Sequence, residues 1–218
     1  MPVSWFMLLL GLWAPLPSSA YTDDVETVRP LWHRSYKDPQ SLLPRGTTFL
    51  DDPVMLERFL AALDGTPPDW KGVYRGGEEG HGDRLFLVNR NRDRLREGNP
   101  ALQQRVAFVW EGIVSGYDPT TGGFRLAIGP KVIPTKWGQV RFKPYGLPSG
   151  LVAVPSPSLR KRLRDRKARG ESIEVDLVLT GRLTPEESII YDFAHEEPGQ
   201  GMVMPVVQVE RVDYFLAD

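Results

Sequence analysis

Residues 105–117 read RVAFVWEGIVSGY, a long run rich in β-branched and aromatic residues that contains Gly112 and Gly116. Such residues favour a strand, and a glycine inside a long strand is typical of a sharp bend. Residues 118–123 (DPTTGG) follow, where proline and glycine indicate a tight turn. Residues 124–128 are again mostly apolar. The stretch therefore predicts a β-hairpin whose first strand bends strongly.

The chain after this hairpin continues with strands around one helix. A third strand is expected around residues 138–143, resuming at residues 151–154, and a helix over residues 157–169. Residues 171–183 (ESIEVDLVLTGRL) and residues 204–216 (MPVVQVERVDYFL) then alternate between apolar and polar side chains. A period of two is typical of a strand with one buried face. The sequence therefore predicts five strands with a helix between the third and the fourth.

This order of elements is that of the OB-fold, a small five-stranded barrel. The phrases DLVLTGRLT (residues 176–184) and VVQVERVDYF (residues 206–215) resemble the last two strands of exported bacterial OB-fold proteins. The resemblance covers residues 104–216 at the level of the fold. It implies a mostly β protein with a five-stranded OB-like barrel over residues 104–218, preceded by a helical region.

Residues 21–103 are expected to form an N-terminal arm with helices that pack on the barrel. Residues 21–50 show only weak periodicity, so we expect Trp32 and His33 to lie on an irregular segment. Two helices follow in the prediction. The first is capped by Asp52 and ends at Gly65, and the second spans residues 83–97. The alternative for residues 84–88 (RLFLV) is the beginning of a strand. The residues of the second helix expected to face inward are Leu85, Phe86 and Leu95.

The composition narrows the function classes. Apolar residues make up 41% and charged residues 25% of the 218 residues, which is ordinary for a globular protein and argues against general disorder. The net charge is −1, so no overall field attracts nucleic acid or membranes. The chain has no cysteine, which excludes disulfides, thiol nucleophiles and thiolate metal sites.

Residues 1–20 differ from the rest of the chain. Residues 6–16 (FMLLLGLWAPL) are uncharged and apolar, and residues 18–20 (SSA) are small, as signal peptidase requires. The run is too short to span a bilayer comfortably. We therefore expect a signal peptide cleaved after Ala20 and a periplasmic or secreted protein. The alternative is a membrane anchor formed by residues 4–17.

Two histidines lie close to carboxylates in the sequence. His81 belongs to residues 75–83 (RGGEEGHGD), whose four glycines predict a surface loop, and His195 precedes two glutamates. Imidazole beside carboxylates suits a metal ion or a general base. However, neither stretch has the spacing of a known metal motif. We expect solvated loops and assign no catalytic, cofactor-binding or metal-binding residue, and no cofactor.

Residues 160–169 carry seven basic side chains and one acidic side chain. Such a helix can hold the phosphates of lipids or nucleic acid, or an acidic partner. It has no aromatic residue on which a base could stack. Its basic side chains are either a solvated surface or a contact site, and in the second case we expect Arg160 and Arg164 to make the contact.

Aromatic residues are common near the hairpin, and OB barrels bind oligonucleotides and oligosaccharides with aromatic side chains of this region. Trp137 and Tyr145 flank the third strand beside glycines, so we expect these two to be the most exposed of the aromatic side chains. The alternative to a binding platform is packing in the core or at the rim of the barrel. The candidate ligand or partner contacts are therefore Trp137, Tyr145, Tyr117, Arg160, Arg164 and His195.

The leading hypothesis is a non-catalytic binding or scaffolding protein of the cell envelope, with an envelope protein, a peptide or a carbohydrate as its partner. One alternative is a metal-assisted hydrolase that uses His81 or His195 with nearby carboxylates. Another is the binding of single-stranded nucleic acid or anionic lipid through residues 160–169, with peripheral membrane contact. Export argues against nucleic acid. The chain also has no nucleophile elbow, phosphate-binding loop or dinucleotide fingerprint.

Overall fold

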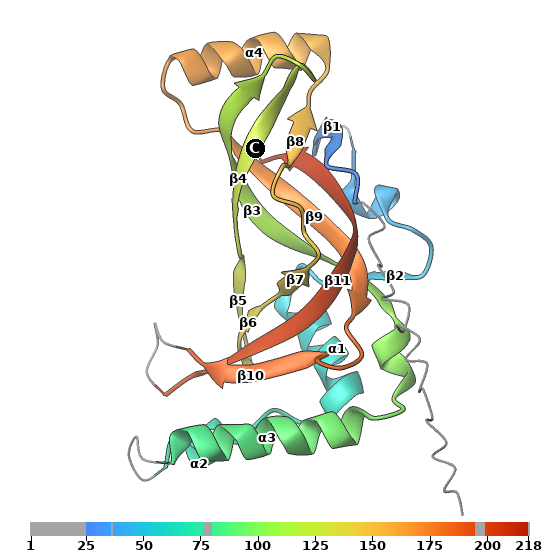
Figure 1. The fold of residues 1–218 in the computed structure, drawn as a ribbon, viewed down its shortest axis with the longest axis vertical. Coiled ribbons are helices and arrows are strands. Elements are labelled where there is room, and N and C mark those ends of the chain that lie inside the picture. The colour runs from blue at the N-terminus through green and yellow to red at the C-terminus, as the bar shows by residue number, and fades with distance from the viewer. Residues whose placement is uncertain (1–24, 36, 76–79, 195–198, 218) are drawn as a thin grey trace, which may run out of the picture.

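A closed β-barrel of six strands lies at the centre of the computed structural model (Figure 1). The residues that the structure describes are 25–35, 37–75, 80–194 and 199–217. Around the barrel the strands are β1 (Val28–His33), β8 (Val152–Val154), β4 (Gly123–Gly129), β3 (Arg105–Asp118), β9 (Glu174–Leu183) and β11 (Gly201–Leu216), and β11 pairs with β1 again. The protein is mostly β and OB-like, but the barrel has six strands where the sequence predicts five.

The predicted hairpin is confirmed as β3 and β4. β3 pairs antiparallel with β4 along one edge and with β9 along the other. A register shift between Val114 and Gly116 bends the strand where it turns toward β4. At Gly112, a Cβ atom would lie 2.6 Å from Cδ1 of Leu177, so only glycine allows the strands to approach this closely.

The sixth strand, β1, comes from the segment that the sequence analysis assigns to the arm. It runs parallel to β8 over Val28–Pro30 and parallel to β11 over Leu31–His33. The prediction of an irregular segment at Trp32 and His33 is therefore wrong. β8 has only three residues, and β1 fills the remaining space between β8 and β11.

A buried carboxylate holds β1 against β11. Asp213 is buried, and its side chain lies 3.2 Å from the guanidinium of Arg29 on β1 and 2.6 Å from that of Arg211. The neighbouring Tyr214 donates a hydrogen bond of 2.8 Å from its hydroxyl to the carbonyl oxygen of Thr27. Both contacts join the start of β1 to the end of the chain, so the barrel closes through side chains as well as through the strand ladder.

The helix α4 (Pro157–Ala168) lies across one end of the barrel, between β8 and β9 in the chain (Figure 1). Leu159 and Leu163 are buried, because their four-residue spacing places both on the face of the helix toward the barrel, and Gly170 ends the helix with a φ of +80°. The predicted helix and its position between the third and fourth strands of an OB-like barrel are confirmed.

The other end of the barrel carries a helical layer (Figure 1). Its helices are α1 (Pro53–Asp64), α2 (Trp70–Val73) and α3 (His81–Arg96). Additional short strands are β2 (Thr47–Phe49), β5 (Val132–Thr135), β6 (Gly138–Arg141), β7 (Lys143–Tyr145) and β10 (Ile189–Phe193), and 3-10 turns span Pro39–Leu42 and Pro100–Gln103. Among the described residues, no helix is both long enough and apolar enough to cross a membrane.

Asp52 caps α1 as predicted, because its side chain accepts hydrogen bonds from the backbone of Val54 and Met55. The inward face of α3 differs from the prediction. Leu85 is buried, but the side chains of Phe86 and Leu95 are 63% and 71% exposed. The largest buried side chain of this helix is Arg96, so α3 faces the barrel with polar groups.

Arg96 is only 1% exposed because it lies in a buried polar network between α1, α3 and β10. Its Nε donates to Asp64 at 2.7 Å, and its Nη1 donates to the hydroxyl of Ser188 at 2.9 Å. The hydroxyl of Tyr191 also donates to Asp64, and Arg92 lies 3.4 Å from the same carboxylate. The network fixes the helical layer to the barrel.

Removing Arg96 would leave the carboxylate of Asp64 buried without its main partner. We expect Arg96→Ala to lower the free energy of unfolding by about 3 kcal/mol, measured by urea denaturation. Arg94→Ala, which removes an exposed arginine from the same helix, is expected to change it by less than about 0.5 kcal/mol. Equal effects of the two substitutions would contradict this role of Arg96.

Alkaline pH should weaken the fold. Burial raises the pKa of Tyr191, and the adjacent Asp64 carboxylate raises it further; burial also raises the pKa of Tyr214. Because both pKa values are higher in the folded state, their stabilising contribution is complete below the ordinary tyrosine pKa of 10.0 and falls as pH rises above it.

Urea midpoints measured between about pH 8 and pH 11 should therefore decrease above about pH 10. Tyr214→Phe should reduce this slope, whereas Tyr145→Phe, at an exposed position, should leave it unchanged. A slope that is the same in the wild type and in Tyr214→Phe would contradict the contribution of the buried phenol.

Candidate functional site

Three of the predicted contact residues come together where α4 meets the β3–β4 hairpin. The guanidinium of Arg164 lies 5.0 Å from the centre of the Tyr117 ring. Arg160 packs against Gly122, which has a φ of +67° and where a Cβ atom would lie 2.8 Å from Nη1 of Arg160. These two arginines therefore attach α4 to the end of the hairpin.

Other basic side chains of α4 also have partners within the protein. Lys167 donates to the carbonyl oxygen of Val114 at 2.8 Å. Arg169 and Arg166 donate to Glu171 at 2.7 and 2.9 Å, and these hydrogen bonds lower the pKa of the Glu171 carboxyl. Within the described part of the chain, three of the seven basic side chains of residues 160–169 make a hydrogen bond or ion pair, and Arg160 and Arg164 pack against the hairpin. Lys161 and Arg162 make neither kind of contact there.

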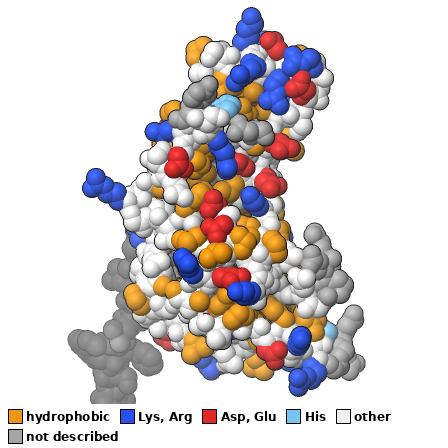
Figure 2. All heavy atoms as spheres, turned by 180° about the vertical axis from the view of Figure 1, so that it is seen from behind, with side chains coloured by type: hydrophobic (Ala, Val, Ile, Leu, Met, Phe, Trp, Pro, Cys, Tyr) orange, Lys and Arg blue, Asp and Glu red, His pale blue; other side chains and the backbone are white. Residues whose placement is uncertain are grey.

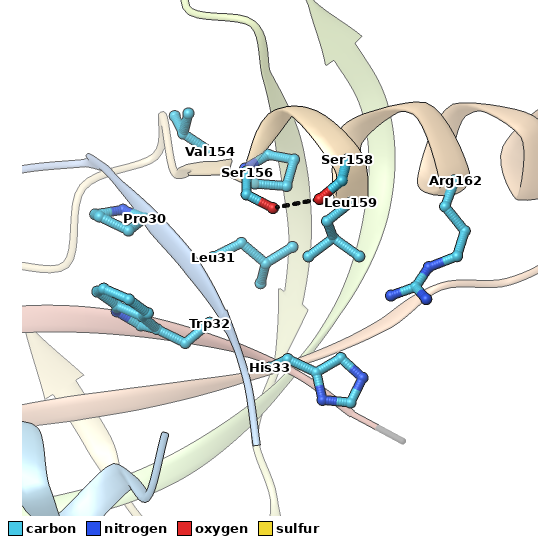
Figure 3. A pocket seen from close by; sticks show the side chains of 10 residues that line it. Pro30, Leu31, Trp32, His33, Val154, Ser156, Ser158, Leu159 and Arg162 are labelled. Carbon is cyan, nitrogen blue, oxygen red and sulfur yellow. Dashed lines mark hydrogen bonds between the residues drawn. The ribbon is translucent and has the colours of Figure 1, made fainter. Parts of the chain in front are cut away.

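Arg162 lines a pocket of about 550 Å³ between α4 and β1, which we call the β1–α4 pocket. Figure 3 shows Arg162 on α4 and His33 on β1 bordering the same space, with Leu31 and Leu159 to one side of it. The pocket is lined by Pro30, Leu31, Trp32, His33, Val154, Pro155, Ser156, Ser158, Leu159 and Arg162.

The pocket exists because β8 ends early. β8 pairs with β1 only as far as Pro30 and Val154. Pro155 comes next, and proline cannot donate a hydrogen bond to the strand ladder because it has no N–H group. The chain then turns into α4, while β1 continues for three more residues along β11. The β1–α4 pocket occupies the space that β8 leaves.

The lining of the pocket favours a negatively charged ligand. It contains the guanidinium of Arg162 and the hydroxyls of Ser156 and Ser158, which lie 3.3 Å apart, and among the described residues no aspartate or glutamate lines it. Nδ1 of His33 accepts a hydrogen bond of 3.3 Å from the backbone of Ser35, which orients the ring. Figure 2 shows Lys and Arg side chains gathered at the end of the molecule that carries α4.

Trp137 is not exposed, contrary to the prediction. Its side chain is 2% exposed, and its carbonyl oxygen accepts a hydrogen bond of 2.6 Å from the indole of Trp70. Gly138 has a φ of +115°, and a Cβ atom there would collide with the carbonyl oxygen of Gly201. The glycine beside Trp137 thus marks a close backbone approach instead of an exposed rim.

Tyr145 is 63% exposed, as predicted, but it lies on β7, which pairs with β11 at Val206–Gln208, and it does not line the β1–α4 pocket. His195 lies outside the described residues. His81 begins α3 and contacts Tyr74 and Phe193, with its Nε2 3.1 Å from the carbonyl oxygen of Tyr74. The prediction of a loop at His81 is therefore wrong.

The hypothesis of a metal site gains no support from the part of the chain that the structure describes, since no group of three histidine, aspartate or glutamate side chains there could hold a metal ion. Glu78 and Glu79, like His195, lie outside that part.

The sequence analysis does not assign Ser156, Ser158 and Arg162 to a site. The sequence does show that Arg162 and Arg160 lie on different sides of the helix. The two arginines flank the buried stripe of Leu159 and Leu163 on opposite sides. Which flank faces a pocket depends on β1, a strand that the sequence pattern does not reveal.

Comparisons with protein-family models, with curated proteins and with solved structures find no match for this chain.

The attachment of α4 to the hairpin can be tested at Gly122. Its positive φ and the nearby Arg160 guanidinium disfavour a side chain, so we expect Gly122→Ala to lower the free energy of unfolding by about 1–2 kcal/mol in urea denaturation. Gly98→Ala, at a φ of +76° where an added Cβ would have nothing within 4 Å, is the matched control for the backbone strain, which costs about 1 kcal/mol. A cost at Gly122 no larger than that at Gly98 would contradict the attachment.

Proposed function

We propose that this protein is a non-catalytic binding module of the cell envelope and that the β1–α4 pocket binds an anionic group of its ligand. The observation that carries the proposal is the position of Arg162. Its guanidinium borders a pocket that no acidic side chain of the described residues lines, and within that part of the chain it has no ion pair or hydrogen bond. A carboxylate or phosphate there would accept hydrogen bonds from Arg162.

Binding is better supported than catalysis because of how the polar groups of the pocket are engaged. The hydroxyls of Ser156 and Ser158 lie within hydrogen-bonding distance of each other. The Nδ1 atom of His33 already accepts a hydrogen bond from its own segment, from Ser35. A nucleophile requires a general base within hydrogen-bonding reach, and a serine paired with another serine offers a binding surface instead.

The two alternatives have less support. A metal-assisted hydrolase at His81 would need carboxylate ligands, but His81 packs against Tyr74 and Phe193. Binding of a long polyanion along α4 would need several unpaired cations, whereas Arg166 and Arg169 are paired with Glu171 and Lys167 donates to the carbonyl oxygen of Val114. A single anionic group at the pocket fits the remaining charges better.

The location in the envelope is inferred from residues 1–20, which have the pattern of a signal peptide cleaved after Ala20. The resemblance of residues 104–216 to exported bacterial OB-fold proteins supports the same location. Proteins of this compartment meet acidic peptides, carbohydrates and lipid phosphates, all of which carry anionic groups that the pocket could accept.

The proposal predicts weak binding of simple anions at the pocket. We expect acetate and inorganic phosphate, titrated into the protein at low ionic strength, to bind in the millimolar range and to shift NMR signals of the pocket residues. Arg162→Gln should weaken this binding about fivefold to tenfold, because it removes a charged hydrogen-bond donor. Lys161→Gln is the matched control, since Lys161 is also exposed but does not line the pocket.

Binding that is equally weakened by the two substitutions would reflect only the general charge of α4. That outcome, or the absence of any binding in the wild type, would contradict an anion site at the pocket.

A further inference from the structure

We infer that the β1–α4 pocket takes its anionic group as part of an extended peptide, which adds a strand to the edge of β1 beside Leu31 and Trp32. The inference rests on the proposed function for the anionic contact and adds the class of ligand. It follows from the strand pairing, the size and the lining of the pocket.

The strand pairing leaves one edge of β1 open. β1 pairs with β8 over Val28–Pro30 and with β11 over Leu31–His33. Within the described residues, no strand pairs with Leu31 or Trp32 on the side from which β8 has departed. An open edge carries backbone N–H and C=O groups, and an extended peptide can form hydrogen bonds with them.

The space beside this edge suits a short extended chain. Its volume of about 550 Å³ lies within the usual range of about 300–1,000 Å³ for pockets that hold small ligands. A folded domain would not fit there. Pro155 and the first turn of α4 form the opposite wall, so the added strand would take the place that β8 leaves after Val154.

The side chains of the pocket indicate which peptide it prefers. In an extended chain, every second side chain points to the same face. Leu31 and Leu159 form an apolar contact surface on one side of the pocket, and Arg162 lies beside them (Figure 3). We therefore expect a ligand segment with an apolar residue and an acidic residue two positions apart.

A peptide fits these features better than a nucleic acid or a lipid surface. The edge of β1 can form a strand ladder with the N–H and C=O groups of another peptide backbone. Neither a nucleic acid nor a lipid has such a backbone. The ring of Trp32, the aromatic residue of the lining, packs against a separate buried cluster that includes Ala107, Val178 and Phe215. Because this packing and Lys37, whose Nζ lies 6.0 Å from the ring centre, both engage the ring, it is not an open platform for the stacking of a base.

The test uses a fluorescent heptapeptide of alternating threonine and valine in which the central valine is replaced by aspartate. Two matched peptides isolate the two contacts. One carries asparagine in place of the aspartate, and the other carries N-methyl groups on alternate backbone amides. Binding is measured by fluorescence anisotropy with the full chain and with its Arg162→Gln and Lys161→Gln variants.

We expect the aspartate peptide to bind, and the asparagine peptide and Arg162→Gln each to weaken binding about tenfold. The two changes together should weaken it no further, because they remove the same contact. N-methylation should weaken binding at least about tenfold, since it removes backbone donors. Lys161→Gln should leave binding unchanged.

Different failures separate the two proposals. Equal affinity for the N-methylated and unmethylated peptides, with acetate and phosphate still bound through Arg162, would overturn strand addition and leave the anion site standing. No binding of the peptides or of the small anions would overturn both. Binding of vesicles of anionic phospholipid through Arg162, without peptide binding, would overturn the peptide in favour of a lipid headgroup.

Discussion

The insertion of β1 between β8 and β11 determines the rest of the architecture. β8 is only three residues long and ends at Val154. Without β1, the barrel would stay open on one side beyond that residue. β1 closes it through parallel pairing with both neighbours, and the buried Asp213 fixes β1 by contacts with Arg29 and Arg211. A buried carboxylate needs such partners, so the ion pairs and the ladder support each other.

The pocket follows from the same arrangement. β1 pairs with β8 only over Val28–Pro30. Its last residues, Leu31–His33, extend past the end of β8 and lie opposite α4. α4 is in turn held at the barrel end by Arg160, Arg164 and Lys167, which contact the β3–β4 hairpin. These three side chains contact the hairpin from one flank of the helix. Arg162 lies on the opposite flank and lines the pocket.

Local patterns in the sequence were sufficient for the elements whose partners are near in the chain. The hairpin of β3 and β4, the caps of α1 and the buried stripe of α4 follow from spacing and turn residues. β1 could not be found in this way, because it has six residues, includes a proline and pairs with distant strands. Trp137 was misjudged and the burial of Arg96 was missed for a similar reason, since Trp137 contacts Trp70 and Arg92, and Arg96 contacts Asp64, which are far away in the sequence.

The central claim is that ligands bind at the open edge of β1 and at Arg162. The most direct measurement is an NMR titration of the isotope-labelled protein with the aspartate peptide, following the backbone amide of every assigned residue. The account predicts that the shifts concentrate at Leu31–His33 and at residues 156–162, on both walls of the pocket. Shifts that concentrate instead on α3 and β10, or around Tyr145, would contradict it.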